Sequence, residues 1–308
     1  MSVDDDIPFN RDFPLKPGIV DRPVPGVRRV LCGNPGPFTF TGTVSYIVGE
    51  GHVAIIDPGP DDDAHVAALL EAVRGETVTH IFATHTHRDH SPAVPRIKQA
   101  TGATVYAEGP HRAARPMHDG EPGRKESNDL DFHPDVQLKD GEIVQDDGWA
   151  LQAVATPGHT ANHMAYAWCE RSLTFVGDHV MGWSTTIVVP PDGAMVDYMA
   201  SLEKLAARSE QLYFPGHGPE IPEGPRFAQF MIRHRRAREA SILHRLAKGE
   251  ADIPSIVRAS YIGIDPRLVS AAGYSVLAHL EDMVERGIVA TDGAPAIDKI
   301  YRLLVPLG

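Results

Sequence analysis

The part of the 308-residue chain with the most evident chemistry is residues 84–90, which read THTHRDH. Three imidazoles and one carboxylate, those of His85, His87, His90 and Asp89, fall within six positions. Neutral imidazole nitrogens are common ligands of divalent metals and a carboxylate adds a harder oxygen, so this set suits zinc, with manganese or iron as alternatives. Because one tetrahedral ion needs four ligands, four candidates in so short a loop indicate two ions, each completed from elsewhere in the chain.

Four further segments have the same form, an apolar stretch followed by a turn and a ligand-type residue. Downstream, these residues are His159, Asp178 and His217, each preceded by glycine. Glycine at such turns lets the backbone come close to an ion. Upstream, residues 53–57 (VAIID) end in Asp57, which we expect to orient a ligand or the loop rather than to bind metal itself.

The chain contains 16 histidines, so several must be incidental. His163 and His179 lie close to the candidate ligands in sequence, and we expect each to support a ligand or to lie near the substrate. Neither is assigned as a ligand. Histidines without a surrounding motif, such as His65 and His133, are expected at the surface or satisfied in the core.

In this order, these segments resemble the metallo-β-lactamase superfamily over the first two thirds of the chain. The resemblance implies that one ion is bound by His85, His87 and His159. It implies that a second ion is bound by Asp89, His90 and His217, and that Asp178 bridges the two. It also implies a shared hydroxide, with Asp89 as the catalytic residue that orients it or carries its proton. Such a layout is that of a hydrolase.

The elements that must position these residues indicate an α/β protein. Residues 81–83 read as a buried strand. Residues 84–90, which we call the metal loop, therefore lie at the mouth of a sheet. Helix signals cover residues 61–74, 94–100 and 194–208. Together with the resemblance, they predict an αββα sandwich, in which two mixed sheets pack face to face with helices outside and metals at one edge. Residues 107–140 predict a long loop that borders the substrate groove.

A change in composition at residues 219–225 (PEIPEGP) predicts a domain boundary, with a catalytic domain at residues 1–222 and a long helix plus winged-helix domain at residues 223–308. The C-terminal part predicts two long helices separated by a short one, then a two-stranded wing, at residues 225–248, 252–258, 266–285, 287–290 and 299–304. Glu281, Asp282 and Glu285 lie on the last helix. We therefore expect a lid or a homodimer contact rather than the reading of duplex DNA.

Three segments narrow the resemblance to the branch known as β-lactamase-like protein 2, namely residues 177–186, 197–202 and 234–239. Its better-known members are endoribonucleases that act on single-stranded RNA. The basic run at residues 233–238 predicts either a solvated helix face or a phosphate-facing edge over the metal site. In the second case Arg235 and Arg238 would lie near the substrate.

Composition excludes some classes of protein. No stretch reaches the ~20 apolar residues that span a bilayer, and the acidic residues 1–6 are not followed by the apolar core of a signal peptide. Only two cysteines are present, which gives no disulfide framework and predicts a reducing cytoplasm. The net charge of -12 disfavours a nucleic-acid partner, because phosphate binding draws on basic surface.

We therefore predict a dinuclear metal-dependent hydrolase, foremost a phosphodiesterase or endoribonuclease acting on single-stranded RNA. The alternative is a glyoxalase II-like hydrolase of a small-molecule thioester, either hydroxyacylglutathione or acyl-CoA. A more remote alternative is a non-catalytic binding protein on the same fold. The same set of metal ligands can support hydrolysis of phosphodiesters and of thioesters, so the ligands alone do not identify the substrate.

Overall fold

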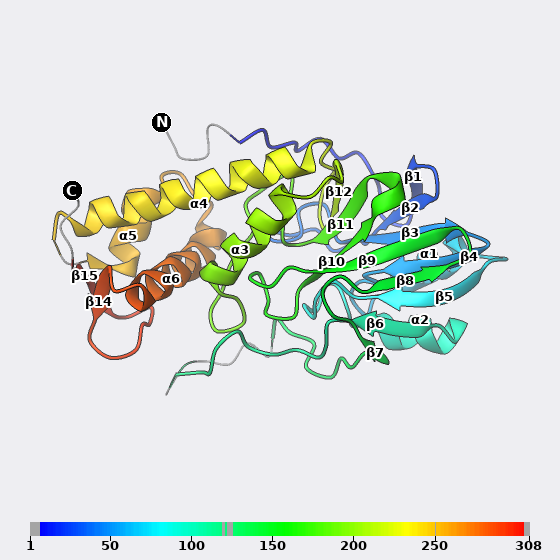
Figure 1. Cartoon of the computed structure of the whole chain (residues 1–308), viewed down its shortest axis with the longest axis horizontal. Helices are drawn as coiled ribbons and strands as arrows, with labels where there is room; N and C mark the ends of the chain where they lie inside the picture. Colours follow the sequence, from blue (N-terminus) through cyan, green and yellow to red (C-terminus); the bar gives the residue numbers. More distant parts are fainter. Residues whose placement is uncertain (1–6, 119–120, 122–125, 250, 305–308) are drawn as a thin grey trace.

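Two mixed β-sheets packed face to face, with helices on both outer faces, are followed by a small C-terminal domain (Figure 1). This architecture comes from a computed structural model that describes residues 7–118, 121, 126–249 and 251–304. The acidic residues 1–6 and part of the long loop predicted at residues 107–140 lie outside the described residues. The predicted αββα sandwich with a C-terminal winged-helix domain is confirmed.

The first sheet has seven strands in the order β1-β2-β3-β4-β5-β6-β7. They are β1 (Val20–Val24), β2 (Val27–Leu31), β3 (Val44–Glu50), β4 (His52–Ile56), β5 (Thr77–Phe82), β6 (Thr104–Ala107) and β7 (Val136–Gln137). Strands β1 to β4 pair antiparallel, whereas β4 to β7 pair parallel.

The second sheet has five strands in the order β12-β11-β10-β9-β8. They are β8 (Ile143–Asp146), β9 (Trp149–Ala155), β10 (Met164–Trp168), β11 (Leu173–Gly177) and β12 (Leu212–Pro215). Within this sheet, β11 and β12 pair parallel and the other neighbours pair antiparallel. The 3₁₀ turn η1 (Cys169–Arg171) joins β10 to β11.

The core between the sheets follows from the alternation of side chains along the strands. In β3, Val44, Tyr46 and Val48 face the second sheet and pack with residues such as Phe175. Ile47 points the other way and joins the cluster beneath the helices. Because successive side chains of a strand point to opposite faces, a strand that is apolar on both sides is buried from both.

Helices α1 (Asp63–Ala72) and α2 (Val94–Thr101) cover the first sheet, and α3 (Met195–Ala206) and α4 (Gly224–Leu246) cover the second. Asp62 caps α1 by accepting a hydrogen bond from the backbone nitrogen of His65 at 2.8 Å. These four helices match three helix signals and the long helix predicted from the sequence.

The C-terminal domain contains α5 (Ile253–Ser260), the 3₁₀ turn η2 (Pro266–Leu268), α6 (Val269–Glu285) and a three-stranded sheet. The predicted two-stranded wing is present as β14 (Val289–Thr291) paired with β15 (Ile300–Leu303). A third strand, β13 (Ala251–Asp252), pairs with β15 from the other side. The sequence pattern did not predict this strand, because two residues carry no alternation.

Helix α4 belongs to both parts of the molecule. Its first half, with Phe227 and Met231, packs against Tyr198 and Leu202 of α3. Its last turns, with Ile242, pack in the core of the C-terminal domain, and Figure 1 shows the helix extending from the sheets to that domain. The boundary predicted between residues 222 and 223 stays a prediction. None of the helices in the described part of the chain combines the length and hydrophobicity of a membrane span.

Candidate metal centre

Loops from both sheets bring the seven predicted ligands together at one edge of the sandwich. The loop after β5 carries four of them, and one each follows β9, β11 and β12, namely His159, Asp178 and His217. They form a first ligand group of His85, His87, His159 and Asp178, and a second ligand group of Asp89, His90 and His217. Within each group, one potential ligand atom per residue lies within 4.8 Å of all the others.

The ring nitrogens of the first ligand group point at one another. Nδ1 of His87 lies 3.0 Å from Nε2 of His85 and 3.0 Å from Nε2 of His159. Nδ1 of His159 lies 2.7 Å from the carbonyl oxygen of Ile187, which places the ring proton there and leaves Nε2 with its lone pair. Converging lone pairs repel one another unless a cation lies between them, so this donor set fits a divalent metal.

The second ligand group shows the same convergence with two imidazoles and one carboxylate. Nε2 of His217 lies 3.2 Å from Oδ2 of Asp89. Nε2 of His90 lies 3.6 Å from the same oxygen and has no hydrogen-bond partner among the described residues. On its far side, Nδ1 of His217 lies 3.2 Å from the carbonyl oxygen of Gly42, which places one ring proton there and leaves Nε2 as the potential ligand atom that faces the group.

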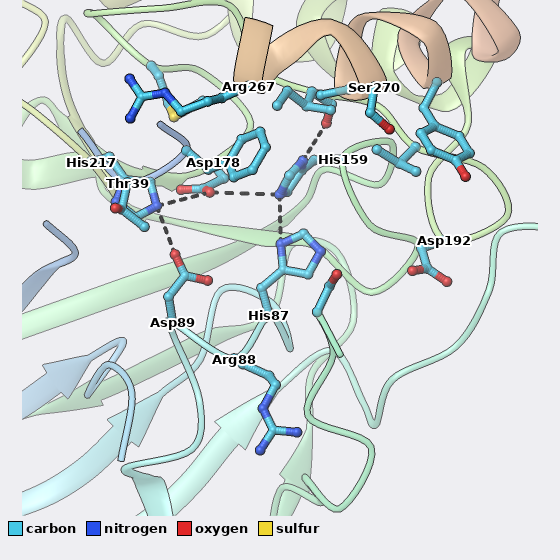
Figure 2. A pocket seen from close by; sticks show the side chains of 17 residues that line it. Thr39, His87, Arg88, Asp89, His159, Asp178, Asp192, His217, Arg267 and Ser270 are labelled. Carbon is cyan, nitrogen blue, oxygen red and sulfur yellow. Dashed lines mark hydrogen bonds and ion pairs between the residues drawn. The ribbon is translucent and has the colours of Figure 1, made fainter. Parts of the chain in front are cut away.

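Asp178 lies between the two ligand groups, as Figure 2 shows. Its Oδ2 is 3.7 Å from Nε2 of His159 in the first group and 3.3 Å from Nε2 of His217 in the second. Its Oδ1 is buried, accepts no hydrogen bond among the described residues, and lies 3.5 Å from Nε2 of His90. Asp178 therefore has carboxylate oxygens within 3.7 Å of histidine nitrogens in both groups.

Asp57 and His163 lie behind the ligands. Asp57 accepts hydrogen bonds at 2.7 Å from both the backbone nitrogen and Oγ1 of Thr84, and its Oδ2 lies 2.9 Å from Nδ1 of His90. His163 accepts a hydrogen bond at 3.2 Å from the backbone nitrogen of Asp178. Both residues are buried and contact ligand residues directly, so their contacts orient ligands rather than substrate.

The two ligand groups differ in their preferred protonation. Burial, reinforced by His159, lowers the pKa of His87 to about 3, and burial holds the pKa of His85 well below its usual range. Although burial opposes it, the carboxylates of Asp178 and Asp89 raise the pKa of His217 to about 10. The first group thus offers neutral imidazoles, whereas the second carries a proton on His217 that a divalent cation would replace.

A cavity of about 510 Å³ opens onto both ligand groups. Phe38, Met181, Ile187 and Val189 give it apolar walls, and η2 and α6 add a wall of four residues, Arg267, Ser270, Ala271 and Tyr274. Arg88, in the metal loop, and Arg267 are the two arginines among its described lining residues. The C-terminal domain therefore forms part of the candidate site.

Sequence reasoning did not single out the polar residues beside this cavity. Asp192 lines the cavity, accepts a hydrogen bond at 2.7 Å from Nδ2 of Asn128, and lies 3.5 Å from Nε2 of His111. No local spacing connects these residues, because Asn128 and His111 come from the long loop after β6 and Asp192 follows β11. The prediction that the long loop borders the site agrees with Ser127, which lines the cavity.

Of the two alternatives for residues 233–238, a phosphate-facing edge over the metal site does not agree with the positions of Arg235 and Arg238. Arg235 and Arg238 are each 2% exposed and do not line the cavity at the ligand groups. Arg235 donates a hydrogen bond to the carbonyl oxygen of Thr186, and Arg238 donates one to that of Ser260. These side chains lie on the inner face of α4, which the sequence pattern did not identify.

Family models match both parts of the chain. Residues 38–217 match the Metallo-beta-lactamase superfamily, and residues 253–299 match the Beta-lactamase associated winged helix domain.

Two curated relatives of the chain carry different names. The chain is 31% identical to the beta-lactamase-like protein 2 homolog of Drosophila melanogaster, over 87% of this chain and 91% of that protein. It is 32% identical to the atrochrysone carboxyl ACP thioesterase AgnL7 of Paecilomyces divaricatus, over 67% of this chain and 60% of that protein.

Solved structures share the fold over almost the whole chain. A metallo-beta-lactamase family protein from Thermus thermophilus has a TM-score of 0.73 at 23% identity, covering 91% of this chain and 99% of that one. A beta-lactamase domain protein from Burkholderia ambifaria has a TM-score of 0.76 at 18% identity, covering 95% of each chain.

Proposed function

The chain belongs to the metallo-β-lactamase superfamily and carries the associated winged-helix domain, and from this premise we propose that it is a dinuclear metal-dependent hydrolase of acyl thioesters. Members of this superfamily are mostly hydrolases, and the His/Asp groups described above supply candidate ligands for two ions. The thioester class rests on one observation, the apolar character of the cavity that faces those ligands.

The walls of this cavity suit an acyl group. Phe38, Met181, Ile187 and Val189 line it from the catalytic domain, and Ala271 and the ring of Tyr274 line it from α6. Burying apolar surface of a substrate is worth roughly 25 cal/mol per Å² before the costs of association. A chain of phosphates would instead have to remove its charges from water against these side chains.

Seven residues would hold the two ions: His85, His87, His159 and the shared Asp178 on one side, and Asp89, His90 and His217 on the other. We propose zinc, with manganese or iron as alternatives, because nitrogen ligands outnumber carboxylates. When bound, such ions lower the pKa of water toward neutrality and polarise a carbonyl oxygen.

Among the residues of the site, Asp89 is the one that would orient the attacking water. The side chain of Asp89 is 27% exposed, compared with 8% for Asp178, so water and substrate reach it from the cavity. Although burial opposes it, the imidazoles of His90 and His217 lower its pKa, which keeps it an anion that accepts a hydrogen bond from the attacking water. Water adds to the acyl carbon, the carbon–sulfur bond breaks, and the proton from water passes to the departing sulfur.

A nuclease activity is the second candidate, and a specific observation favours it. Arg88 and Arg267 line the cavity at the ligand groups and offer two cations to a phosphodiester. The relative named beta-lactamase-like protein 2 homolog also aligns with most of this chain. Against it stand the net charge of -12 and the burial of Arg235 and Arg238 away from the cavity.

A parallel rate measurement separates the two candidates. The purified protein, loaded with zinc or manganese, is assayed on octanoyl-CoA and lactoylglutathione by thiol release and on labelled single-stranded RNA by cleavage. We expect thioester turnover that disappears in Asp89→Ala and no RNA cleavage. RNA cleavage that disappears in the same variant, without thioester turnover, would instead establish the nuclease, and inactivity on all substrates would overturn both proposals.

Metal counting tests the dinuclear site without reference to substrate. Asp178→Ala removes the carboxylate that lies between both ligand groups, so we expect bound metal to fall from two ions per chain to fewer than one after dialysis. Two ions retained per chain would show that Asp178 does not bridge them.

A further inference from the structure

A second cavity, of about 320 Å³, lies between the catalytic domain and the winged-helix domain. Its walls come from α4, from the segment between α5 and α6, and from the loop that contains Trp183 and Thr186. Phe38, Met181 and Ile187 line this second cavity as well as the one at the ligand groups. The two cavities are therefore neighbours that share a wall.

Arg235 lines the second cavity with its charge uncompensated. The side chain is almost fully buried, donates to the carbonyl oxygen of Thr186, and stacks over the ring of Tyr198 at 5.1 Å from its centroid. Its Nε has no hydrogen-bond partner, and no ion pair joins Arg235 to a carboxylate anywhere in the described part of the chain. A buried guanidinium without an anion is costly, so such a group indicates a missing anionic partner.

The neighbouring Arg236 shows the contrast. It is exposed and forms an ion pair at 2.9 Å with Glu203, as surface arginines commonly do. Arg235 and Arg236 are adjacent on the same helix and carry the same charge, yet of these two only Arg235 lines a cavity.

The other charged groups of the second cavity are mostly positive. Arg11 and Arg238 also line it, and Asp265 is the one acid among its described lining residues. Asp265 is already paired with Arg267 at 2.7 Å. Arginines therefore outnumber acids among the charged residues that line this cavity, within a chain whose net charge is -12.

The remaining lining residues are largely apolar and include Ile264, Leu268 and Ala272. A ligand that matches this cavity has an apolar body and one anionic end. The planar guanidinium fork matches a carboxylate in shape, and one uncompensated charge matches one negative charge.

We infer that the second cavity binds a carboxylate at the far end of the substrate's acyl group, with Arg235 as its partner. Resting on the proposed thioesterase activity, this inference makes the substrate a thioester whose acyl chain ends in an acidic group. The thioester end lies at the ligand groups, and the chain passes along the shared wall at Phe38 and Ile187.

Binding to the metal-free protein tests the cavity without any hydrolysis. The probes are octanoate, octanamide and octyl phosphate, added to protein dialysed against EDTA and followed by calorimetry and by the fluorescence of Trp183, which lines the cavity. We expect octanoate to bind at least about tenfold more tightly than octanamide, as for one charge-assisted contact. Equal affinities for octanoate and octanamide would overturn the anionic site. Octyl phosphate binding about tenfold more tightly than octanoate would overturn the carboxylate assignment.

Matched variants assign the effect to Arg235. Arg235→Gln should remove the preference for octanoate, whereas Arg236→Gln, which removes the same charge from the exposed side of α4, should leave it unchanged. An equal preference for octanoate over octanamide in the two variants would overturn the role of Arg235. If Arg235→Gln does not fold, Ser184→Phe fills the second cavity from a half-buried position and should weaken octanoate binding about tenfold or more, and unchanged binding would overturn the site.

Hydrolysis then tests the link to the substrate. The ratio of kcat/KM for the monothioester of octanedioic acid to that for the octanoyl thioester should be about ten or more in the unmodified protein and near unity in Arg235→Gln. A ratio near unity in the unmodified protein would overturn the assignment of the acyl chain. Octanoate binding without turnover of either thioester would leave the carboxylate site standing and overturn the proposed function, so the two failures are distinguishable.

Discussion

Oδ2 of Asp57 lies 2.9 Å from Nδ1 of His90, on the side of the imidazole that faces away from Asp89 and Asp178. Asp57 is buried at the end of β4 and adopts a positive φ of 49°, which is uncommon for a residue other than glycine. Its carboxylate also accepts two hydrogen bonds from Thr84. One carboxylate thus fixes both the orientation of His90 and the start of the metal loop.

Asp57→Asn should weaken metal binding mainly at the second ligand group. The amide is neutral and makes a weaker partner for the ring N–H of His90, and loss of such supporting contacts typically costs roughly 10–100-fold in metal affinity. Metal titration against a competing chelator measures this change. Asp63→Asn, an exposed change, is the control, and equal affinities in the two variants would contradict the role of Asp57.

Gly216→Ala should disturb the same region by steric overlap. A Cβ at this position would overlap Oδ1 of Asp178 and lie 2.6 Å from Cε1 of His90. We expect a loss of about 1–3 kcal/mol of stability in the metal-free protein, together with weaker metal binding. Gly273→Ala in α6 meets its nearest neighbour at an ordinary 3.7 Å and should be neutral or stabilising by up to ~1 kcal/mol. Thermal melts compare the two, and a neutral Gly216→Ala would show that the ligands shift without cost.

His65 should make the metal-free protein less stable in acid. Burial lowers its pKa to about 4, despite the opposing charge of Asp62, and its Nε2 lies 2.8 Å from Oγ of Ser45. Between pH 6.5 and about 4 the unfolded chain binds a proton at this residue that the folded chain does not, so stability falls as pH falls through this window. The contribution is on the order of 2–3 kcal/mol.

Urea denaturation at pH 7 and at about pH 4.5 measures this effect. In His65→Gln the difference in unfolding free energy between the two pH values should shrink by about 2 kcal/mol. The exposed His133→Gln should leave the difference unchanged. An unchanged difference in His65→Gln would show that other buried groups cause the acid sensitivity.

Arg115 should couple the long loop to the winged-helix domain. Its guanidinium forms ion pairs at 2.8 Å with Glu121 in the loop and at 2.5 Å with Glu281 in α6. A double-mutant cycle of Arg115→Gln and Glu281→Gln should give a coupling free energy of about 1–2 kcal/mol, because both side chains are mostly buried. The same cycle on the exposed pair Arg236–Glu203 should give about 0–1 kcal/mol. Equal coupling in the two cycles would mean that burial adds nothing to the Arg115 pair.

The elements of the sandwich and the positions of the candidate ligands could be predicted from the sequence because both are local signals. Each ligand follows a strand closely, as His85 follows β5 and His217 follows β12. The carboxyl ends of such strands meet at one edge, so neighbouring turns meet as well. The grouping of the ligands is therefore what the sequence indicated, and their binding of metal stays a prediction.

The cavity walls could not be predicted, since they depend on how the two domains meet. Tyr274 and Ser270 are ordinary residues of a helical pattern, and only the packing of α6 brings them to the ligands. Arg235 likewise looks like part of a solvated basic run. Its burial depends on contacts with Tyr198 and Thr186, which are distant in the sequence.

Because α4 packs in the cores of both domains, it limits where domains can be exchanged between relatives. A cut at the start of this helix would remove Phe227, Met231 and Ile232 from the catalytic domain. The apolar surface exposed in this way would promote aggregation. A cut after its last turn would do the same to the winged-helix domain through Ile242 and Leu246. A chimaera that is to remain soluble should therefore inherit all of α4 from one parent, together with the partner surfaces on both sides.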